Sequence, residues 1–328
     1  MNLLNRRSFL LAALRGCFLL AASASLVRAA SVPVTADLDF TIAGDMRYFT
    51  ENPGPEAPVL WVGKSAHPQP GMRYFDGVCE ALKRVGPGAF LLSPGDFDPP
   101  AVNRAMIDRY LGPKFPWYTV VGNHEVENAA VMTWVRQWMK SDIPNVVRRG
   151  MPGTNFTIYS WEVGNSHFVA IDSYPWAKPG NPGYQGRVDM SDAMFKWIDE
   201  DLAATKKPFI WVTGHQPLES LPDMDSGRVR HEGESVSYDA GRAQQFVALL
   251  QKYHVRAYLC GHTHNASIVK LNSGVWQVDS GHARGAGDPG SPSSFVKVRT
   301  VGDQAWVDLY RANPQGEDYK VRTTVKLD

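Results

Sequence analysis

The sequence predicts an α/β fold in which strands and helices alternate along one large domain. Short apolar runs that end in Gly-Asp, Gly-Asn-His or Gly-His alternate with longer segments whose apolar residues recur at helical spacing. With 44% hydrophobic and 20% charged residues, the 328-residue chain has the composition of a folded protein and not of a disordered or coiled-coil one. No linker-like stretch divides the body, and about 300 residues can bury one large core.

The individual elements follow from local patterns. A helix is expected at 74–85 because Phe75, Val78 and Leu82 recur at helical spacing, and Ser191 can cap another helix. In chain order, strands are expected at 38–43, 89–93, 117–121, 155–162, 166–171, 209–213, 255–260, 275–280, 295–300 and 305–310, and helices at 74–85, 101–110, 132–139, 191–204 and 240–253. The domain is expected to span 38–311 and to be followed by a C-terminal tail at 312–328.

The first 29 residues have the form of an export signal. The pair Arg6-Arg7 precedes an apolar run that contains small residues towards its end, an order that resembles the twin-arginine type. Arg15 interrupts the run, so a stable membrane span is not expected in the mature protein. Val27-Arg28-Ala29 places small residues before a cleavage site after Ala29. We expect a periplasmic or secreted protein, with an uncleaved amphipathic anchor as the alternative.

Charge and cysteine content exclude two classes of protein. Lys+Arg 34 against Asp+Glu 33 gives a formal net charge of +1, and removal of residues 1–29 leaves 30 basic and 33 acidic side chains. Such a weakly acidic body lacks the clustered positive charge of a nucleic-acid-binding surface. Cys79 and Cys260 are too few for a disulfide framework. Cys260 is expected to be a buried strand thiol, although a bridge to Cys79 is an open alternative.

Polar side chains follow five of the expected strands. They are Asp45, Asp96, Asn123, His215, and the pair His262 and His264. In open α/β folds the ligand site lies at the carboxyl ends of the strands, so we expect these side chains to converge. Carboxylate, amide and imidazole donors without a thiolate suit Mn, Fe or Zn. One aspartate shared between two ions would give a two-metal site that activates water.

The other histidines have less specific surroundings. His67, His167, His231, His254 and His282 are expected to be ordinary surface or core residues. Two of them are possible exceptions: His231 lies in a polar loop that can reach the site, and His282 follows Gly281 soon after the last motif.

Taken in order, the motifs resemble those of the calcineurin-like metallophosphoesterase superfamily, which includes the purple acid phosphatases. The resemblance rests on Asp45, Gly95-Asp96, Gly122-Asn123-His124-Glu125, Gly214-His215 and Gly261-His262-Thr263-His264, and it covers about Phe40 to Gly281. It implies a four-layer α/β sandwich, in which two mixed β-sheets are flanked by helices and two metals lie at the strand ends. The motifs specify the superfamily and not the substrate.

The resemblance also implies a role for each residue. One metal ion would take Asp45, Asp96 and His264, and the other would take Asp96, Asn123, His215 and His262, with Asp96 bridging. His124 matches the family's non-ligand histidine, which contacts the phosphate and helps to protonate the leaving group. The implied activity is hydrolysis of small phosphomonoesters or phosphodiesters by metal-activated hydroxide, with Mn, Fe or Zn as the metals.

The first motif departs from the family pattern. Most members have Asp-x-His, whose histidine is a metal ligand, but this chain has Asp45-Met46-Arg47. Purple acid phosphatases instead use a tyrosine three residues after the second aspartate, where this chain has Pro99. A guanidinium stays protonated and has no lone pair to give.

Three interpretations of this departure are open. Water or Asp98 completes a weaker first site, Arg47 binds a substrate phosphate bidentately, or one metal alone is held firmly. We favour the first two together.

Two alternatives to a soluble exported enzyme follow from the same residues. A degenerate protein of this fold would bind a phosphate ligand without metal-stimulated turnover, and an uncleaved signal would give a membrane-anchored phosphatase. The aromatic- and proline-rich segments 48–71 and 174–184 are expected to shape the pocket.

Overall fold

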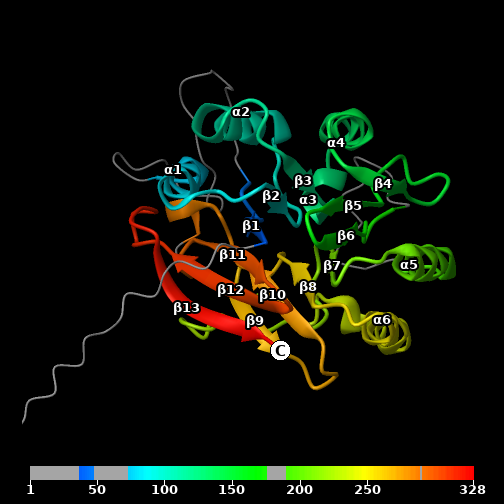
Figure 1. Cartoon of the computed structure of the whole chain (residues 1–328). Helices are drawn as coiled ribbons and strands as arrows, with labels where there is room; N and C mark the ends of the chain where they lie inside the picture. The colour runs from blue at the N-terminus through cyan, green and yellow to red at the C-terminus, as the bar shows by residue number, and fades with distance from the viewer. Residues whose placement is uncertain (1–36, 48–72, 176–189, 289) are drawn as a thin grey trace, which may run out of the picture. The chain divides into compact units, whose positions relative to one another are not determined.

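The computed structural model describes residues 37–47, 73–175, 190–288 and 290–328 (Figure 1). These residues belong to one compact unit, which spans Thr35–Asp328. The expected signal segment 1–29 lies outside the described residues, as do nearly all of the two segments expected to shape the pocket.

Two mixed β-sheets form the centre of this unit (Figure 1). The six-stranded sheet has the order β13-β12-β11-β1-β2-β3, and the seven-stranded sheet has the order β4-β5-β6-β7-β8-β10-β9. Within them β1, β2 and β3 are parallel neighbours, as are β6, β7, β8 and β10. The strands are β1 (Leu38–Ile42), β2 (Leu91–Ser93), β3 (Trp117–Thr119), β4 (Val146–Arg149), β5 (Tyr159–Val163), β6 (Ser166–Ala170), β7 (Phe209–Thr213), β8 (Ala257–Cys260), β9 (Ala266–Lys270), β10 (Trp276–Ser280), β11 (Ser294–Val301), β12 (Gln304–Arg311) and β13 (Lys320–Leu327).

Helices cover the outer faces of the two sheets (Figure 1). They are α1 (Phe75–Val85), α2 (Pro100–Leu111), α3 (Asn123–Val126), α4 (Ala129–Ser141), α5 (Asp192–Ala204) and α6 (Ala240–Lys252), with single 3₁₀ turns at Val236–Tyr238 and Gly285–Gly287. Met194 of α5 and Phe246 of α6 pack in one apolar cluster with Val212 of β7. On the other side, Trp134 and Trp138 of α4 contact the ring of Trp117 in β3.

Aromatic side chains join the inner faces of the two sheets. The ring of Phe40 in β1 lies 5.2 Å from that of Phe168 in β6 and 5.6 Å from that of Trp211 in β7, both edge-to-face. Phe90, next to β2, makes a similar contact with Phe168 at 5.3 Å. Such pairs stabilise a core beyond the area they bury. The predicted sandwich of two mixed sheets flanked by helices is confirmed.

The structure differs from the expected elements in specific places. β4, β9 and β13 were not expected, and β13 pairs with β12 within the segment 312–328 that was predicted to be a tail. The strand expected from residue 155 begins only at Tyr159, because Asn155 and Phe156 have positive φ angles that interrupt extended backbone. Cys79 and Cys260 are both buried free thiols, so they form no bridge.

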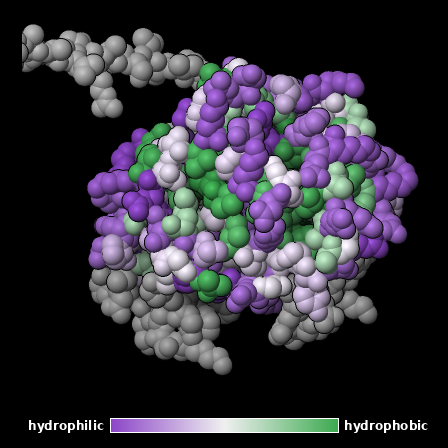
Figure 2. All heavy atoms as spheres, turned by 90° about the horizontal axis from the view of Figure 1, so that it is seen from below, coloured by the Kyte–Doolittle hydropathy of each residue, from purple (hydrophilic) through white to green (hydrophobic). Residues whose placement is uncertain are grey.

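The surface of this unit is mixed in character. Figure 2 shows a face on which apolar residues gather near the middle and hydrophilic side chains surround them. Val269 of β9 and Val321 of β13 are among the exposed apolar residues. Over the described ranges, no helix combines the length and apolarity that crossing a bilayer requires.

Candidate metal centre

The predicted ligands converge where five parallel strands end. Asp45 follows β1, Asp96 follows β2, and Asn123 follows β3. His215 follows β7, and His262 and His264 follow β8. Short contacts connect all six side chains, and all but Asn123 are buried.

The backbone at these strand ends is tightly turned. Asp45, Asp96, His262 and His264 all have φ between 50° and 73°, a region that non-glycine residues rarely adopt. The neighbouring glycines leave room for the carboxylates: a Cβ on Gly261 would lie 2.3 Å from Asp45 Oδ2. This crowding explains why the motifs combine glycine with a polar residue.

Four acceptor atoms meet in what we call the second site, formed by Asp96, Asn123, His215 and His262. His215 Nε2 lies 3.0 Å from Asn123 Oδ1, 3.2 Å from His262 Nδ1 and 3.4 Å from Asp96 Oδ1. His215 Nδ1 donates to Pro94 O at 2.8 Å, so its Nε2 carries a lone pair. Lone pairs this close repel one another unless a cation lies between them, so this donor set fits a metal ion.

Glu234 fixes the orientation of His262 in the second site. Glu234 Oε2 lies 3.1 Å from His262 Nε2, so His262 donates outward and turns its Nδ1 lone pair inward. Asn123 Oδ1 lies 3.2 Å from that nitrogen. A carboxylate behind a histidine is the usual support of a metal ligand.

The first site consists of Asp45, Asp96 and His264. Their ligand atoms lie within 4.8 Å of one another, and His264 Nε2 is 3.4 Å from Asp45 Oδ1. That Oδ1 atom is buried and has no hydrogen-bond partner, whereas Asp45 Oδ2 accepts from the His262 backbone N–H at 2.9 Å. An orphaned buried carboxylate oxygen aimed at an imidazole also fits a cation.

The two aspartates of the site differ in how readily they ionise, and two of the imidazoles are neutral. Burial opposes ionisation of Asp96, but His124 and His215 outweigh it and hold its pKa well below the usual range. Burial and the nearby Asp96 raise the pKa of Asp45 well above its ordinary value. Burial lowers the pKa of His215 to about 4, and it also lowers the pKa of His264. Both imidazoles are therefore neutral at neutral pH, the state that a metal ligand needs.

Arg47 forms an ion pair with Asp98. Arg47 Nε lies 2.7 Å from Asp98 Oδ1, and Nη2 lies 3.3 Å from Oδ2, so the pair is bidentate. Both side chains are mostly buried, with 19% and 14% of their surface exposed. Asp98 is not part of the cluster of Asp45, Asp96 and His264.

His124 lies beside the bridging carboxylate and is open to solvent. Its Nε2 is 3.6 Å from Asp96 Oδ2, its Nδ1 is 2.9 Å from Glu127 Oε1, and 25% of the side chain is exposed. The adjacent Glu125 is buried and accepts from the backbone N–H groups of Asp96 and Gly122, at 2.9 Å and 2.7 Å. Glu125 thus ties the end of β2 to the start of α3.

Sequence reasoning missed several residues around the site. Asp288 accepts from His264 Nδ1 at 2.6 Å, and Glu234 supports His262, but both come from loops without a motif. Arg284 follows β10, whose carboxyl end lies on the same edge as that of β8, so the strand-end pattern could have identified it.

The two histidines noted as exceptions have different surroundings. The ring of His231 lies 4.5 Å from that of His262, and His231 Nδ1 is 3.0 Å from Glu234 Oε2, so the polar loop does reach the site. His282 is buried behind His264, with Nε2 3.0 Å from Ser291 O. His167 pairs with buried Asp201 in the core at 2.9 Å, an ordinary structural role.

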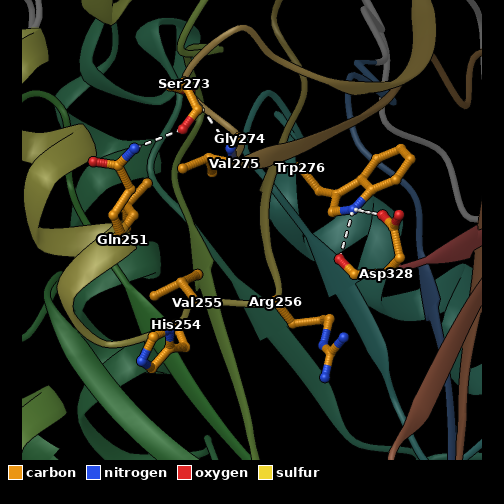
Figure 3. A pocket seen from close by; sticks show the side chains of 10 residues that line it. Gln251, His254, Val255, Arg256, Ser273, Gly274, Val275, Trp276 and Asp328 are labelled. Atoms are coloured by element: carbon orange, nitrogen blue, oxygen red, sulfur yellow. Dashed lines mark hydrogen bonds between the residues drawn. The ribbon is translucent and has the colours of Figure 1, made fainter.

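A separate cavity of about 370 Å³ lies at the other end of the sheet (Figure 3). It is lined by residues at the amino ends of β8 and β10, among them His254 before β8 and Trp276 as the first residue of β10, whereas the metal ligands follow the strands. Figure 3 shows Trp276 turned towards Asp328, to which its indole N–H donates. The cavity contains none of the predicted site residues.

The calcineurin-like phosphoesterase family matches residues 39–266. The chain is 27% identical to tartrate-resistant acid phosphatase type 5 of Mus musculus over 177 residues, which are 51% of this chain and 48% of that protein. The Homo sapiens protein of the same name is 27% identical over 179 residues, 51% of this chain and 49% of that one. The chain thus spans about half the length of the curated relatives it matches.

Solved structures share the fold at low sequence identity. A dimetal phosphatase from Danio rerio superposes with a TM-score of 0.56 and 14% identity, covering 89% of this chain and 99% of that one. The structure of PhoD gives a TM-score of 0.58 and 12% identity, covering 88% and 69%.

Proposed function

Because the chain belongs to the calcineurin-like phosphoesterase family, we propose that it is an exported metal-dependent phosphoesterase. The main observation behind this proposal is the second site, where Asp96 Oδ1, Asn123 Oδ1, His215 Nε2 and His262 Nδ1 lie close together, and where Pro94 and Glu234 bind the other nitrogens of the two imidazoles. Mn, Fe or Zn bound at the two sites would activate water and stabilise charge on the phosphate oxygens.

The chain's own residues supply the remaining chemistry. Asp96 faces both sites and would bridge them. His124 is partly exposed beside Asp96, so it can contact a phosphate and pass a proton to the leaving oxygen. Glu125 holds the two strand ends that carry these residues at a fixed separation.

A substrate and metal panel tests the activity. The purified protein would be assayed with phosphomonoesters and phosphodiesters in the presence of Mn, Fe, Zn or Mg. The relatives named acid phosphatases make phosphomonoesters the first compounds to try. We expect turnover that depends on metal. Phosphate binding without turnover under every metal would instead indicate the non-catalytic alternative.

The second site gives a first prediction. His215→Ala or Asn123→Ala should lower the metal content and abolish most hydrolysis, because each variant removes a group that faces the convergence point. Metal content is measured by elemental analysis and hydrolysis with the best ester of the panel. Full metal and full rate in His215→Ala would contradict the assignment. His254→Ala, at the far end of β8, is the matched control and should change neither.

Export is proposed from the signal-like segment. Arg6→Lys combined with Arg7→Lys keeps the charge but should block a route that reads the guanidinium pair. The measurement is the amount of protein in the periplasm or medium, together with the intact mass, which locates cleavage. Normal export of the double variant would point to the general secretory route, and an uncleaved mass would support a membrane anchor.

A further inference from the structure

Arg284 lies against the first site and donates hydrogen bonds to two of its residues. Its Nη2 is 3.1 Å from His264 Nε2, and its Nε donates to Asp45 O at 3.0 Å. The backbone N–H of Arg284 also donates to His282 Nδ1 at 3.3 Å, and this hydrogen bond holds the Arg284 backbone in place after β10. A guanidinium stays protonated in proteins, so Arg284 is a cation at neutral pH.

The contact between Arg284 and His264 uses the atom that a metal would need. His264 Nδ1 lies 2.6 Å from Asp288 Oδ2, and Arg230 Nη1, which donates to the same carboxylate oxygen at 2.7 Å, also contacts this nitrogen. Because a carboxylate oxygen can only accept, His264 donates its Nδ1 hydrogen to Asp288, and Nε2 carries the ring's available lone pair. Arg284 Nη2 donates to that lone pair. One lone pair cannot serve a guanidinium hydrogen and a metal ion together, so the two compete.

Arg47 removes a second potential ligand from the same site. It stands where a metal-binding imidazole is expected, and it engages Asp98 through both carboxylate oxygens. Two carboxylates, of Asp45 and Asp96, are then left to attract an ion, and Arg284 and Arg47 both lie close enough to affect their charge. Within the described residues, no arginine or lysine side chain forms a hydrogen bond or ion pair with the four ligand side chains of the second site.

We propose that Arg284 serves as the fixed cation of the first site, so that each chain binds one metal ion tightly, at the second site, and a further ion only weakly. The proposal rests on the proposed function for the identity of the second site as a metal site. It extends that function by assigning to a side chain the positive charge that a first metal would otherwise supply.

Mn²⁺ binding to the metal-free, purified full chain tests the proposal directly. Calorimetric titration should give one tight event per wild-type chain, and the electron paramagnetic resonance spectrum should be that of an isolated ion and not of an exchange-coupled pair. In Arg284→Ala, a second event should become about 10- to 100-fold tighter, because His264 Nε2 is released and a positive charge is removed. A coupled pair should then be visible.

Arg228 offers a matched control. It contacts Asp288 Oδ1 at 2.7 Å and the backbone oxygen of His264 at 3.2 Å, so Arg228→Ala removes the same charge from the same network. It leaves the contact at Nε2 in place, and the second Mn²⁺ event should stay weak. An equal gain in both variants would show a general charge effect and overturn the competition.

The outcomes separate this proposal from the proposed function. Two equally tight Mn²⁺ ions in the wild type, or an unchanged second event in a folded Arg284→Ala, would overturn the role of Arg284 whatever the activity. Arg284→Leu replaces the alanine variant if that variant does not fold. The number of Mn²⁺ ions bound tightly per wild-type chain tests the proposal without any variant. Absence of hydrolysis with one Mn²⁺ bound would count against the enzyme and not against Arg284.

Discussion

Arg47 stands where most members of the resembled family have a metal-binding histidine. The guanidinium cannot bind a metal, and the structure pairs it with Asp98, the residue that sequence reasoning offered as a replacement ligand. The ion pair therefore affects two interpretations, that Asp98 completes the first site and that Arg47 binds a substrate phosphate. Asp98 is held by a cation, and Arg47 is held in a fixed position beside the site, where its charge affects Asp96.

Arg47→Ala should raise the Michaelis constant for the phosphoester roughly 10-fold or more without changing metal content, if Arg47 contacts the substrate phosphate. The expected loss is that of a charged hydrogen bond, about 1.5–3 kcal/mol. Asp98→Asn is the control, because it breaks the same ion pair but keeps the guanidinium. If both variants lower stability and neither changes the Michaelis constant, Arg47 acts only through its ion pair.

Arg47→His tests the missing ligand. It adds an imidazole at the position where the family has one, so a second metal ion should bind more tightly than in the wild type. The gain should be larger when Arg284→Ala is present as well, because His264 is then also available. Metal titration of the two single variants and the double variant measures this coupling. Strict additivity would mean that the two arginines act on different sites.

At the scale of elements, the sequence predicted the parts with strong local signals. Helices α1, α5 and α6 lie within about one residue of their expected bounds, and Ser191 accepts from the Met194 N–H as the expected cap. β13 was missed because half-exposed polar residues alternate with its apolar ones and its pairing is with a distant partner, β12.

The site also contains residues that the sequence could predict and residues that it could not. Motif residues at strand ends were predictable because parallel strands bring their carboxyl ends to one edge. Glu234 and Asp288 were not, because each lies in a loop whose path depends on tertiary contacts such as the Arg228–Asp288 pair. His231 could be noted only as a histidine in a loop of suitable length.

Gly261 gives a prediction for the end of β8. A methyl group there would meet Asp45 Oδ2 at 2.3 Å, so Gly261→Ala should displace Asp45 and weaken the hydrogen bond from the His262 N–H. We expect reduced metal affinity and a loss of about 1–3 kcal/mol in the free energy of unfolding. Gly241→Ala in α6 is the control, since its Cβ would make only an ordinary 3.5 Å contact. Equal behaviour of the two variants would contradict the crowding at Gly261.

The whole molecule combines an apolar interior with buried ionisable groups at one edge. The inter-sheet aromatic core needs no charge, whereas the strand ends concentrate Asp45, Asp96, Asp172 and Asp279 in buried positions. Burial raises the pKa values of Asp45, Asp172 and Asp279, whereas nearby histidines lower the pKa of Asp96. These groups make opposite contributions to the pH dependence of the free energy of unfolding, and variants of single residues can separate the contributions.

Asp172 is the most direct case, because burial raises its pKa to about 6 although the Tyr174 N–H donates to it at 2.7 Å. A carboxyl whose pKa is raised by folding binds more protons in the native state between about pH 4 and 6. Its contribution to stability therefore falls as the pH rises through that window.

Asp172→Asn removes this penalty and can keep the hydrogen bond through its amide oxygen. The variant should be more stable than the wild type above about pH 6, by at most about 3 kcal/mol, and the difference should shrink towards pH 4. Urea unfolding of metal-free protein at several pH values measures the difference. Asp303 is exposed, so the control variant Asp303→Asn should differ little from the wild type in its free energy of unfolding at any of these pH values. If the stability gained by Asp172→Asn instead grew as the pH fell, folding would lower the pKa of Asp172 and the prediction would be wrong.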